Sequence, residues 1–146
     1  MGPAAALSLQ IADTPGAWAQ VLAIRLSVFV REQGVPLDEE LDEHDPEALH
    51  VLAFLDGRAA GTGRYYAEGE RAVIGRMAVL PWARGRGVGA AILGELLAQA
   101  HRRGLRAATL AAQLHARPFY ARYGFVAGGP HFLDGGILHQ RMERAL

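Results

Sequence analysis

Three glycines at alternating positions form the most informative stretch of the sequence. Gly85, Gly87 and Gly89 follow an apolar segment that ends at Leu80, and they precede a second apolar segment with helical periodicity. Glycine lets backbone N–H groups approach a ligand without an intervening side chain, and N–H groups at a helix N-terminus attract anions. The stretch therefore predicts a site for a phosphate-bearing ligand, of which a diphosphate is the natural example.

Two other interpretations of these glycines exist. Glycine-rich turns also occur for packing alone. The spacing matches neither the nucleotide P-loop, because no Lys-Ser/Thr pair follows, nor a convincing dinucleotide-binding fingerprint. The surrounding elements must therefore decide what the loop does.

Hydrophobic periodicity predicts the elements that position this loop. Their order fits one mixed, mostly antiparallel sheet with helices on both faces, so the expected fold class is α/β (an α+β mixed sheet) in a single domain over 1–146. The predicted elements are a strand at 7–11, a helix at 15–30, an acidic segment at 38–47, strands at 50–55, 59–67 and 72–80, a helix at 87–103, a strand at 105–111, a short helix at 118–123, and strands from 124 and at 137–142.

Composition narrows the classes of protein. The chain has 146 residues, 51% of them hydrophobic, and no cysteine, which excludes disulfides, thiolate metal sites and a cysteine nucleophile. No run of about 18 apolar residues that could span a bilayer is present. Fifteen basic residues, none of them lysine, balance fifteen acidic ones, which disfavours binding to nucleic acid or to an anionic membrane. We expect a cytoplasmic protein without a metal site.

Charge is nevertheless distributed unevenly along the chain. Seven of the ten residues in 38–47 are acidic, whereas 84–122 holds seven arginines and the single acid Glu95. This asymmetry predicts that the second half holds an anionic ligand. The acidic segment has too little apolar content to be core, so we expect it to be an irregular surface segment or a short helix.

Two motifs carry a resemblance to a known family. The pattern Arg84-x-x-Gly87-x-Gly89 between a strand and a helix resembles the coenzyme A pyrophosphate loop of the GNAT superfamily of N-acetyltransferases. The block from Pro118 to Phe125 is similar to the aromatic-Tyr-x-x-x-Gly-Phe block of the same family, and it comes in the right order. Further matches resemble the ElaA-like branch, namely residues 25–33, Asp42, Asp45, His50 and the pair Ala112-Gln113.

The resemblance implies the GNAT fold, with acetyl-CoA as acyl donor and a V-shaped opening between the fourth and fifth strands. It implies that the backbone of 77–79 pairs with the acetyl-pantetheine arm and that the backbone of 84–89 binds the pyrophosphate, with charge added by the Arg84 and Arg86 side chains. The reaction would be direct attack of a primary amine of a small molecule, peptide or protein on the thioester, without a metal. The implied acetyl-CoA contacts are Met77, Ala78, Val79, Arg84, Gly85, Arg86, Gly87, Val88, Gly89, Gln113 and Tyr120.

Several residues are candidates for proton transfer. Tyr120 matches the family's tyrosine next to the thioester sulfur, where a phenol protonates the departing thiolate. Its alternative is a tyrosine that only packs its ring. Glu32 and His50 are candidate bases, and Glu40, Asp42, Glu43 and His44 could serve as base or in amine recognition. His50 is equally a structural hydrogen-bonding histidine, Glu32 equally an ordinary surface residue, and the acids around Glu40 equally a solvated face.

Alternatives from other functional classes remain open at this point. A non-catalytic acyl-CoA-binding sensor or assembly domain would keep the phosphate loop and lack acceptor chemistry. Nucleic-acid binding through the arginines is disfavoured because no broad basic stripe is present. The acidic segment 38–47 is expected to border the acceptor cleft and to attract a cationic amine, and a homodimer is compatible with the sequence.

Overall fold

A computed structural model of the chain describes residues 6–146. Within these residues every helix is too short or too polar to cross a lipid bilayer. The strands are β1 (Leu7–Ile11), β2 (Leu49–Leu55), β3 (Arg58–Glu68), β4 (Arg71–Val79), β5 (Ala107–Gln113), β6 (Val126–Asp134) and β7 (Ile137–Ala145). The helices are α1 (Pro15–Arg25), α2 (Leu37–Glu40), α3 (Val88–Arg102) and α4 (Arg117–Ala121), with the π-helix η1 (Leu26–Glu32) and the 3₁₀ turns η2 (Pro81–Ala83) and η3 (Leu114–Ala116).

The seven strands form one sheet in the order β1-β2-β3-β4-β5-β7-β6. Neighbouring strands are antiparallel except β4 and β5, which run parallel. The predicted mixed, mostly antiparallel sheet is therefore confirmed, and so is the order of its elements.

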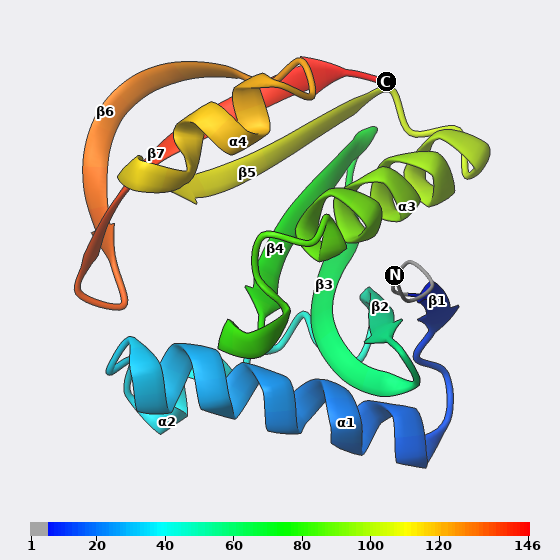
Figure 1. Ribbon diagram of the computed structural model, residues 1–146. Helices are drawn as coiled ribbons and strands as arrows, with labels where there is room; N and C mark the ends of the chain where they lie inside the picture. Colours follow the sequence, from blue (N-terminus) through cyan, green and yellow to red (C-terminus); the bar gives the residue numbers. More distant parts are fainter. Residues whose placement is uncertain (1–5) are drawn as a thin grey trace.

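Helices cover both faces of the first half of the sheet, with α1 and α3 on opposite sides of β2–β4 (Figure 1). Because successive side chains of a strand point to opposite faces, β2 serves both cores. Val51 and Ala53 pack in the cluster that contains the α3 side chains, whereas Leu52 packs with Val21 and Ile24 of α1. Burial of these apolar side chains holds the layers together.

The first helix departs from its prediction. The Thr14 hydroxyl caps it by accepting a hydrogen bond from the Ala17 N–H at 3.2 Å, and Pro15 lies in the first turn, as expected. The α-helical geometry, however, ends at Arg25, and the chain continues as a π-helix to Glu32 instead of an α-helix to residue 30. The periodicity predicts a helix but does not specify whether its backbone hydrogen bonds join residues four or five apart.

The sheet opens between its two halves because β4 and β5 pair over only four positions, from Arg71 with Ala107 to Ile74 with Leu110. Beyond these pairs the strands diverge, so that β4 leads down to η2 while β5 continues toward η3 (Figure 1). The register between β3 and β4 shifts just where the divergence begins, and Arg76 there has a φ of 51°. A bulge of this kind bends its strand. The predicted V-shaped opening between the fourth and fifth strands is thus present.

A buried arginine–carboxylate cluster lies beside this bulge and includes residues of the acidic segment, which forms the short helix α2 and irregular turns, as expected. Arg25, which is fully buried, donates to Glu40 Oε1 at 2.7 Å and to Asp45 Oδ1 at 2.8 Å. Arg64 of β3 donates to the same Asp45 oxygen at 2.6 Å. Glu40 and Asp45 are only 1% and 8% exposed, so the segment is not merely a solvated surface. The cluster comprises Arg25, Glu40, Asp42, Asp45, Arg64 and Arg76.

Asp45 is the member of this cluster whose loss should cost most. Burial would raise its pKa, but hydrogen bonds from Arg25 and Arg64 hold it well below the usual range. Such a carboxylate stabilises the fold above its unfolded pKa of about 3.9 and loses this contribution as the pH falls through the folded pKa.

We expect Asp45→Asn to lower the free energy of unfolding at pH 7 by about 3–5 kcal/mol, because it leaves the three arginines of the cluster with only two carboxylates, Glu40 and Asp42. Urea denaturation followed by circular dichroism measures this. Asp38→Asn is the matched control, since Asp38 is exposed in the same segment, and it should change stability by less than about 0.5 kcal/mol. Equal effects of the two substitutions would contradict the structural role of Asp45.

Candidate active site

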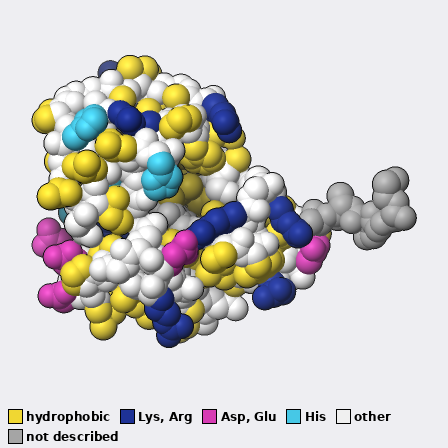
Figure 2. All heavy atoms as spheres, turned by 60° about the vertical axis from the view of Figure 1, so that its left-hand side comes forward, with side chains coloured by type: hydrophobic (Ala, Val, Ile, Leu, Met, Phe, Trp, Pro, Cys, Tyr) yellow, Lys and Arg dark blue, Asp and Glu magenta, His cyan; other side chains and the backbone are white. Residues whose placement is uncertain are grey.

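A cleft of about 990 Å³ occupies the opening between β4 and β5. Its walls come from η1, α2 with the acidic segment, β3, β4, β5, α4 and the β6–β7 hairpin, which are far apart in the sequence. Figure 2 shows a hollow on this face, with a histidine at its upper margin and basic and acidic side chains below it. Of the predicted site residues, those that line the cleft are Glu32, Met77, Ala78, Val79, Arg84, Gln113 and Tyr120.

The wall formed by β4 presents backbone polar groups to the cleft. The Leu80 N–H donates to Ala60 of β3 at 2.8 Å, so strand alternation turns the N–H and C=O of Val79 and Met77 away from β3. The Val79 carbonyl accepts a hydrogen bond from Arg84 Nε at 2.9 Å, which confirms its direction. An extended ligand could therefore add to β4 as a further strand-like partner at the predicted positions.

The glycine-rich loop adjoins the cleft at Arg84 and leads into α3. Gly85 and Gly87 have φ values of 77° and 80°, in the left-handed region that favours glycine, and a Cβ at either would meet no atom within 4 Å. No backbone N–H of residues 85–90 donates to another residue of the described chain 6–146. The loop and the N-terminus of α3 thus offer free N–H groups to an anion.

The other predicted loop residues contribute in different ways. Gly89 has no left-handed backbone, and a Cβ there would contact Phe119 at 3.6 Å, an ordinary packing distance. The Val88 side chain is buried in the core, so only its backbone can serve a ligand. Arg86 is exposed and forms no ion pair within residues 6–146, which leaves its charge available beside the free N–H groups.

Arg84 and Glu32 form an ion pair at the mouth of the cleft. Arg84 donates to the two Glu32 carboxylate oxygens at 2.7 and 2.6 Å. The hydrogen bond from Arg84 lowers the pKa of Glu32, and the hydrogen bond from Glu32 raises that of Arg84. A carboxylate held in this way is a weak proton acceptor, so the geometry does not favour Glu32 as the base.

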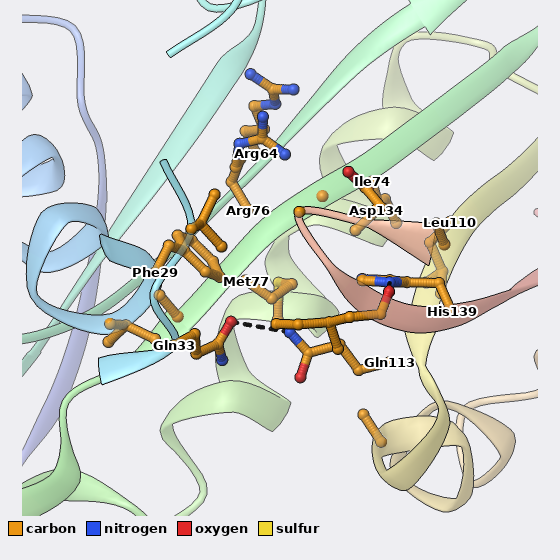
Figure 3. A pocket seen from close by; sticks show the side chains of 18 of the residues that line it. Phe29, Gln33, Arg64, Ile74, Arg76, Met77, Leu110, Gln113, Asp134 and His139 are labelled. Atoms are coloured by element: carbon orange, nitrogen blue, oxygen red, sulfur yellow. Dashed lines mark hydrogen bonds between the residues drawn. The ribbon is translucent and has the colours of Figure 1, made fainter. Parts of the chain in front are cut away.

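Gln113 at the end of β5 lies on the opposite wall. Its Nε2 donates to Gln33 Oε1 at 2.9 Å, so the two amides join η1 to β5 across the cleft (Figure 3). Gln113 therefore lies at the wall of the cleft, and its contact with the acyl donor stays a prediction.

Tyr120 of α4 lines the cleft. Its ring makes edge contacts with Phe119 and Phe125, at centroid distances of 5.0 and 6.0 Å. Its hydroxyl forms no hydrogen bond with any residue between 6 and 146. Burial raises the pKa of Tyr120 to about 12, so the phenol remains protonated at neutral pH and can act as a proton donor.

His50 is placed differently from its prediction as a base. It is buried on β2, where its Nε2 lies 3.0 Å from the Asp45 carbonyl oxygen and its ring packs at 4.7 Å against Trp18. Burial lowers its pKa, and it does not line the cleft. The structural interpretation of His50 therefore fits the geometry better than a role in proton transfer.

The β6–β7 hairpin supplies a further wall of the cleft. Phe132 and Asp134 alternate along β6, and Ile137, His139 and Arg141 alternate along β7, all facing the cleft. The side chains on either side of the turn at 135–136 alternate in character from one residue to the next, which predicts strands that each present one common face. What the pattern does not disclose is that this face borders the cleft.

Comparisons with known proteins agree with this geometry. Residues 23–146 match the model of the family described as "Acetyltransferase (GNAT) domain". A Bacillus subtilis protein described as "Uncharacterized N-acetyltransferase YjcF" is 37% identical over 122 residues, which cover 83% of this chain and 87% of that protein.

Solved structures show the same relationship. The crystal structure of an acyl-CoA N-acyltransferase from Pseudomonas aeruginosa is 33% identical with a TM-score of 0.83, covering 97% of this chain and 99% of that one. Escherichia coli ElaA shares the fold, with a TM-score of 0.82 at 24% identity over 96% of this chain and 99% of its own. The chain therefore belongs to the GNAT family of acetyltransferases and is an acyl-CoA-dependent N-acyltransferase.

Proposed function

We propose that this enzyme transfers the acetyl group of acetyl-CoA to a primary amine of a small molecule, peptide or protein, by direct attack of the amine on the thioester. The observation that carries the proposal is the cleft between β4 and β5, whose lining includes 77–79 of β4, without a β5 partner there, and Tyr120, whose hydroxyl has no partner in residues 6–146. One end of this cleft adjoins the loop with free N–H groups.

The residues present fit acetyl-CoA as the acyl donor. The free N–H groups of 85–90, with the exposed Arg86 beside them, would hold the pyrophosphate. The backbone of 77–79 and the amide of Gln113 would hold the pantetheine arm. When bound, the thioester supplies an activated acyl carbon and a thiol leaving group.

The protein's own groups then have defined tasks. The Tyr120 phenol holds a proton at neutral pH and donates it toward the departing sulfur, which is helpful because a thiol's ordinary pKa of about 8.5 makes its thiolate a poor leaving group in a site with little water. The β4 backbone fixes the direction of approach, which reduces the entropic cost of bringing two reactants together. The amine enters from the side of the β6–β7 hairpin, where the cleft is lined by polar side chains.

The phosphate loop can be tested through ligand-induced stability. Acetyl-CoA should raise the melting temperature by mass action, by the equivalent of about 2.7 kcal/mol at a hundred times its Kd, whereas acetyl-pantetheine, which lacks the phosphates, should do far less. Gly87→Val should abolish most of the difference, because a β-branched residue resists the φ of 80°. Differential scanning fluorimetry measures both effects.

Gly94→Ala is the matched control for that substitution. Gly94 lies in α3 without a left-handed backbone, and a Cβ there meets no atom within 4 Å, so this variant should keep the full acetyl-CoA shift. Equal shifts from the two ligands in the wild-type protein would refute the assignment of the loop to the pyrophosphate.

Tyr120→Phe removes the proton donor and keeps the ring contacts. We expect turnover to fall by roughly 10²–10⁴-fold, with the acetyl-CoA-induced shift and the folding stability nearly unchanged, because the hydroxyl has no partner in the described chain to lose. Thiol release from acetyl-CoA with a panel of primary amines measures turnover.

Tyr123→Phe is the matched control for this experiment, since Tyr123 also contacts Phe119 but does not line the cleft. A folded Tyr120→Phe variant with normal turnover would remove Tyr120 from the mechanism. If the wild-type protein binds acetyl-CoA yet releases no thiol with any amine, the chain is a non-catalytic acyl-CoA-binding domain instead.

A further inference from the structure

His139 of β7 is a histidine in the cleft for which the acyl-donor site has no use. It lies on the same sheet face as Gln113, because the two residues are direct partners in the β5–β7 pairing. Figure 3 shows both side chains at the cavity, His139 from the β7 wall and Gln113 from β5. His139 is thus held beside the strand along which the acyl donor is proposed to bind.

The tautomer of His139 is fixed by its surroundings. Its Nδ1 lies 2.7 Å from the carbonyl oxygen of Ile137, and since a carbonyl oxygen only accepts hydrogen bonds, Nδ1 must carry a proton. In the neutral ring the lone pair is therefore on Nε2. Phe132 stacks on the imidazole with an interplanar angle of 24°, which limits rotation of the ring.

Nε2 of His139 remains open to the cleft. It forms no hydrogen bond with any residue in 6–146. In that part of the chain, the fully buried side-chain atoms without a partner are Glu40 Oε2 and Arg64 Nε, so the unpartnered Nε2 of His139 keeps contact with solvent. Although the residue is only 8% exposed, this remaining contact is with the cleft that it lines.

We propose that His139 is the catalytic base, whose Nε2 takes a proton from the ammonium form of the acceptor amine. The inference rests on the proposed acetyltransferase function and names a residue for its missing step. An oriented imidazole with one free nitrogen is the usual arrangement of a general base.

The protons balance as follows. The acceptor ammonium gives one proton to Nε2 of His139 and becomes a neutral amine. The amine nitrogen then forms a C–N bond with the acyl carbon while the C–S bond breaks. The sulfur takes a proton from Tyr120, and the second proton lost by the amine nitrogen replaces it on the phenol through solvent. His139 returns its proton to solvent, so the products are the N-acetyl amine, CoA thiol and one released proton.

Other groups that titrate in this cleft compete less well. Glu32 and Asp42 are paired with arginines and the pKa of each carboxyl is lowered, which weakens both as bases. Glu40 is held by Arg25 inside the buried cluster. Asp134 is exposed, and within residues 6–146 no ion pair or hydrogen bond orients its carboxylate. The remaining titratable or charged groups that line the cleft are Glu39, Arg64, Tyr66, Arg76, Arg84, His115, Tyr120 and Arg141.

His139→Asn tests the proposal, because asparagine keeps an N–H donor near the position of Nδ1 and lacks a basic nitrogen. We expect kcat/KM for the amine at pH 7 to fall by roughly 10²–10⁴-fold, with an unchanged melting-temperature shift by acetyl-CoA. The difference in kcat/KM between the wild type and the variant should shrink as the pH approaches the pKa of the free amine, about 10, since the amine then loses its proton to solvent. Thiol release measured from pH 6 to 10 gives both results.

His131→Gln is the matched control. His131 lies on the same hairpin, but strand alternation points it away from the face that Phe132 presents to the cleft, so its loss should leave the pH profile unchanged. A folded His139→Asn variant with a normal rate and profile would overturn the assignment. The assignment would also be overturned if the fall in kcat/KM at low pH disappeared in His115→Gln or Asp134→Asn but remained in His139→Asn.

Two further outcomes are separable from these. A wild-type protein that releases no thiol with any amine overturns the acetyltransferase proposal and this inference with it. If His139→Asn does not fold, the ¹⁵N spectrum of the wild-type imidazole decides, because a proton on Nδ1 supports the proposal and a neutral ring protonated on Nε2 overturns it.

Discussion

The arginine–carboxylate cluster beside β4 is the interaction on which the cleft depends. Asp45 binds both Arg25 and Arg64, which ties the helical N-terminal region to β3 through a loop with little apolar content of its own. Arg76, whose backbone is left-handed at the bulge, donates from Nε to the Glu40 carbonyl oxygen at 3.1 Å. A non-glycine residue persists in this conformation only where its surroundings hold it there. The cluster thus supports the bulge at which β4 leaves β5.

The divergence of β4 and β5 leaves backbone polar groups of β4 without a β5 partner. A buried strand normally satisfies its polar backbone on both sides, whereas β4 beyond Ile74 has a partner on the β3 side only. In the described chain the Val79 carbonyl turns instead to Arg84. The same edge that would be a liability on an open sheet becomes a binding surface because the β5–β7 half shields it. The opening of the sheet and the available edge of β4 therefore have one cause, namely that hydrogen bonding between β4 and β5 stops at Ile74.

The parts of the site that could be predicted from sequence are those built from neighbours in the chain. The loop at 85–89 and the block around Tyr120 each combine spacing with a local change from strand or turn to helix. The acidic segment borders the cleft as expected, but its buried ion pairs were missed because the partners, Arg25 and Arg64, lie about twenty residues away on either side and charge patterns do not specify partners. His139 was missed for a related reason. Alternation along β7 predicts a face but not that pairing with β5 brings this face to the cleft.

Two contacts join η1 to the rest of the cleft, and their strength determines whether they obstruct a ligand. The Arg84–Glu32 pair is largely exposed, and pairs of this kind contribute about 0–1 kcal/mol. The Gln33–Gln113 contact is a single neutral hydrogen bond, with a net contribution of about 1 kcal/mol. A ligand that takes the Val79 carbonyl from Arg84 therefore displaces weak interactions and leaves the buried cluster intact. The strong contacts of the buried cluster thus maintain the shape of β4, while the weak contacts lie where the acyl donor is proposed to bind.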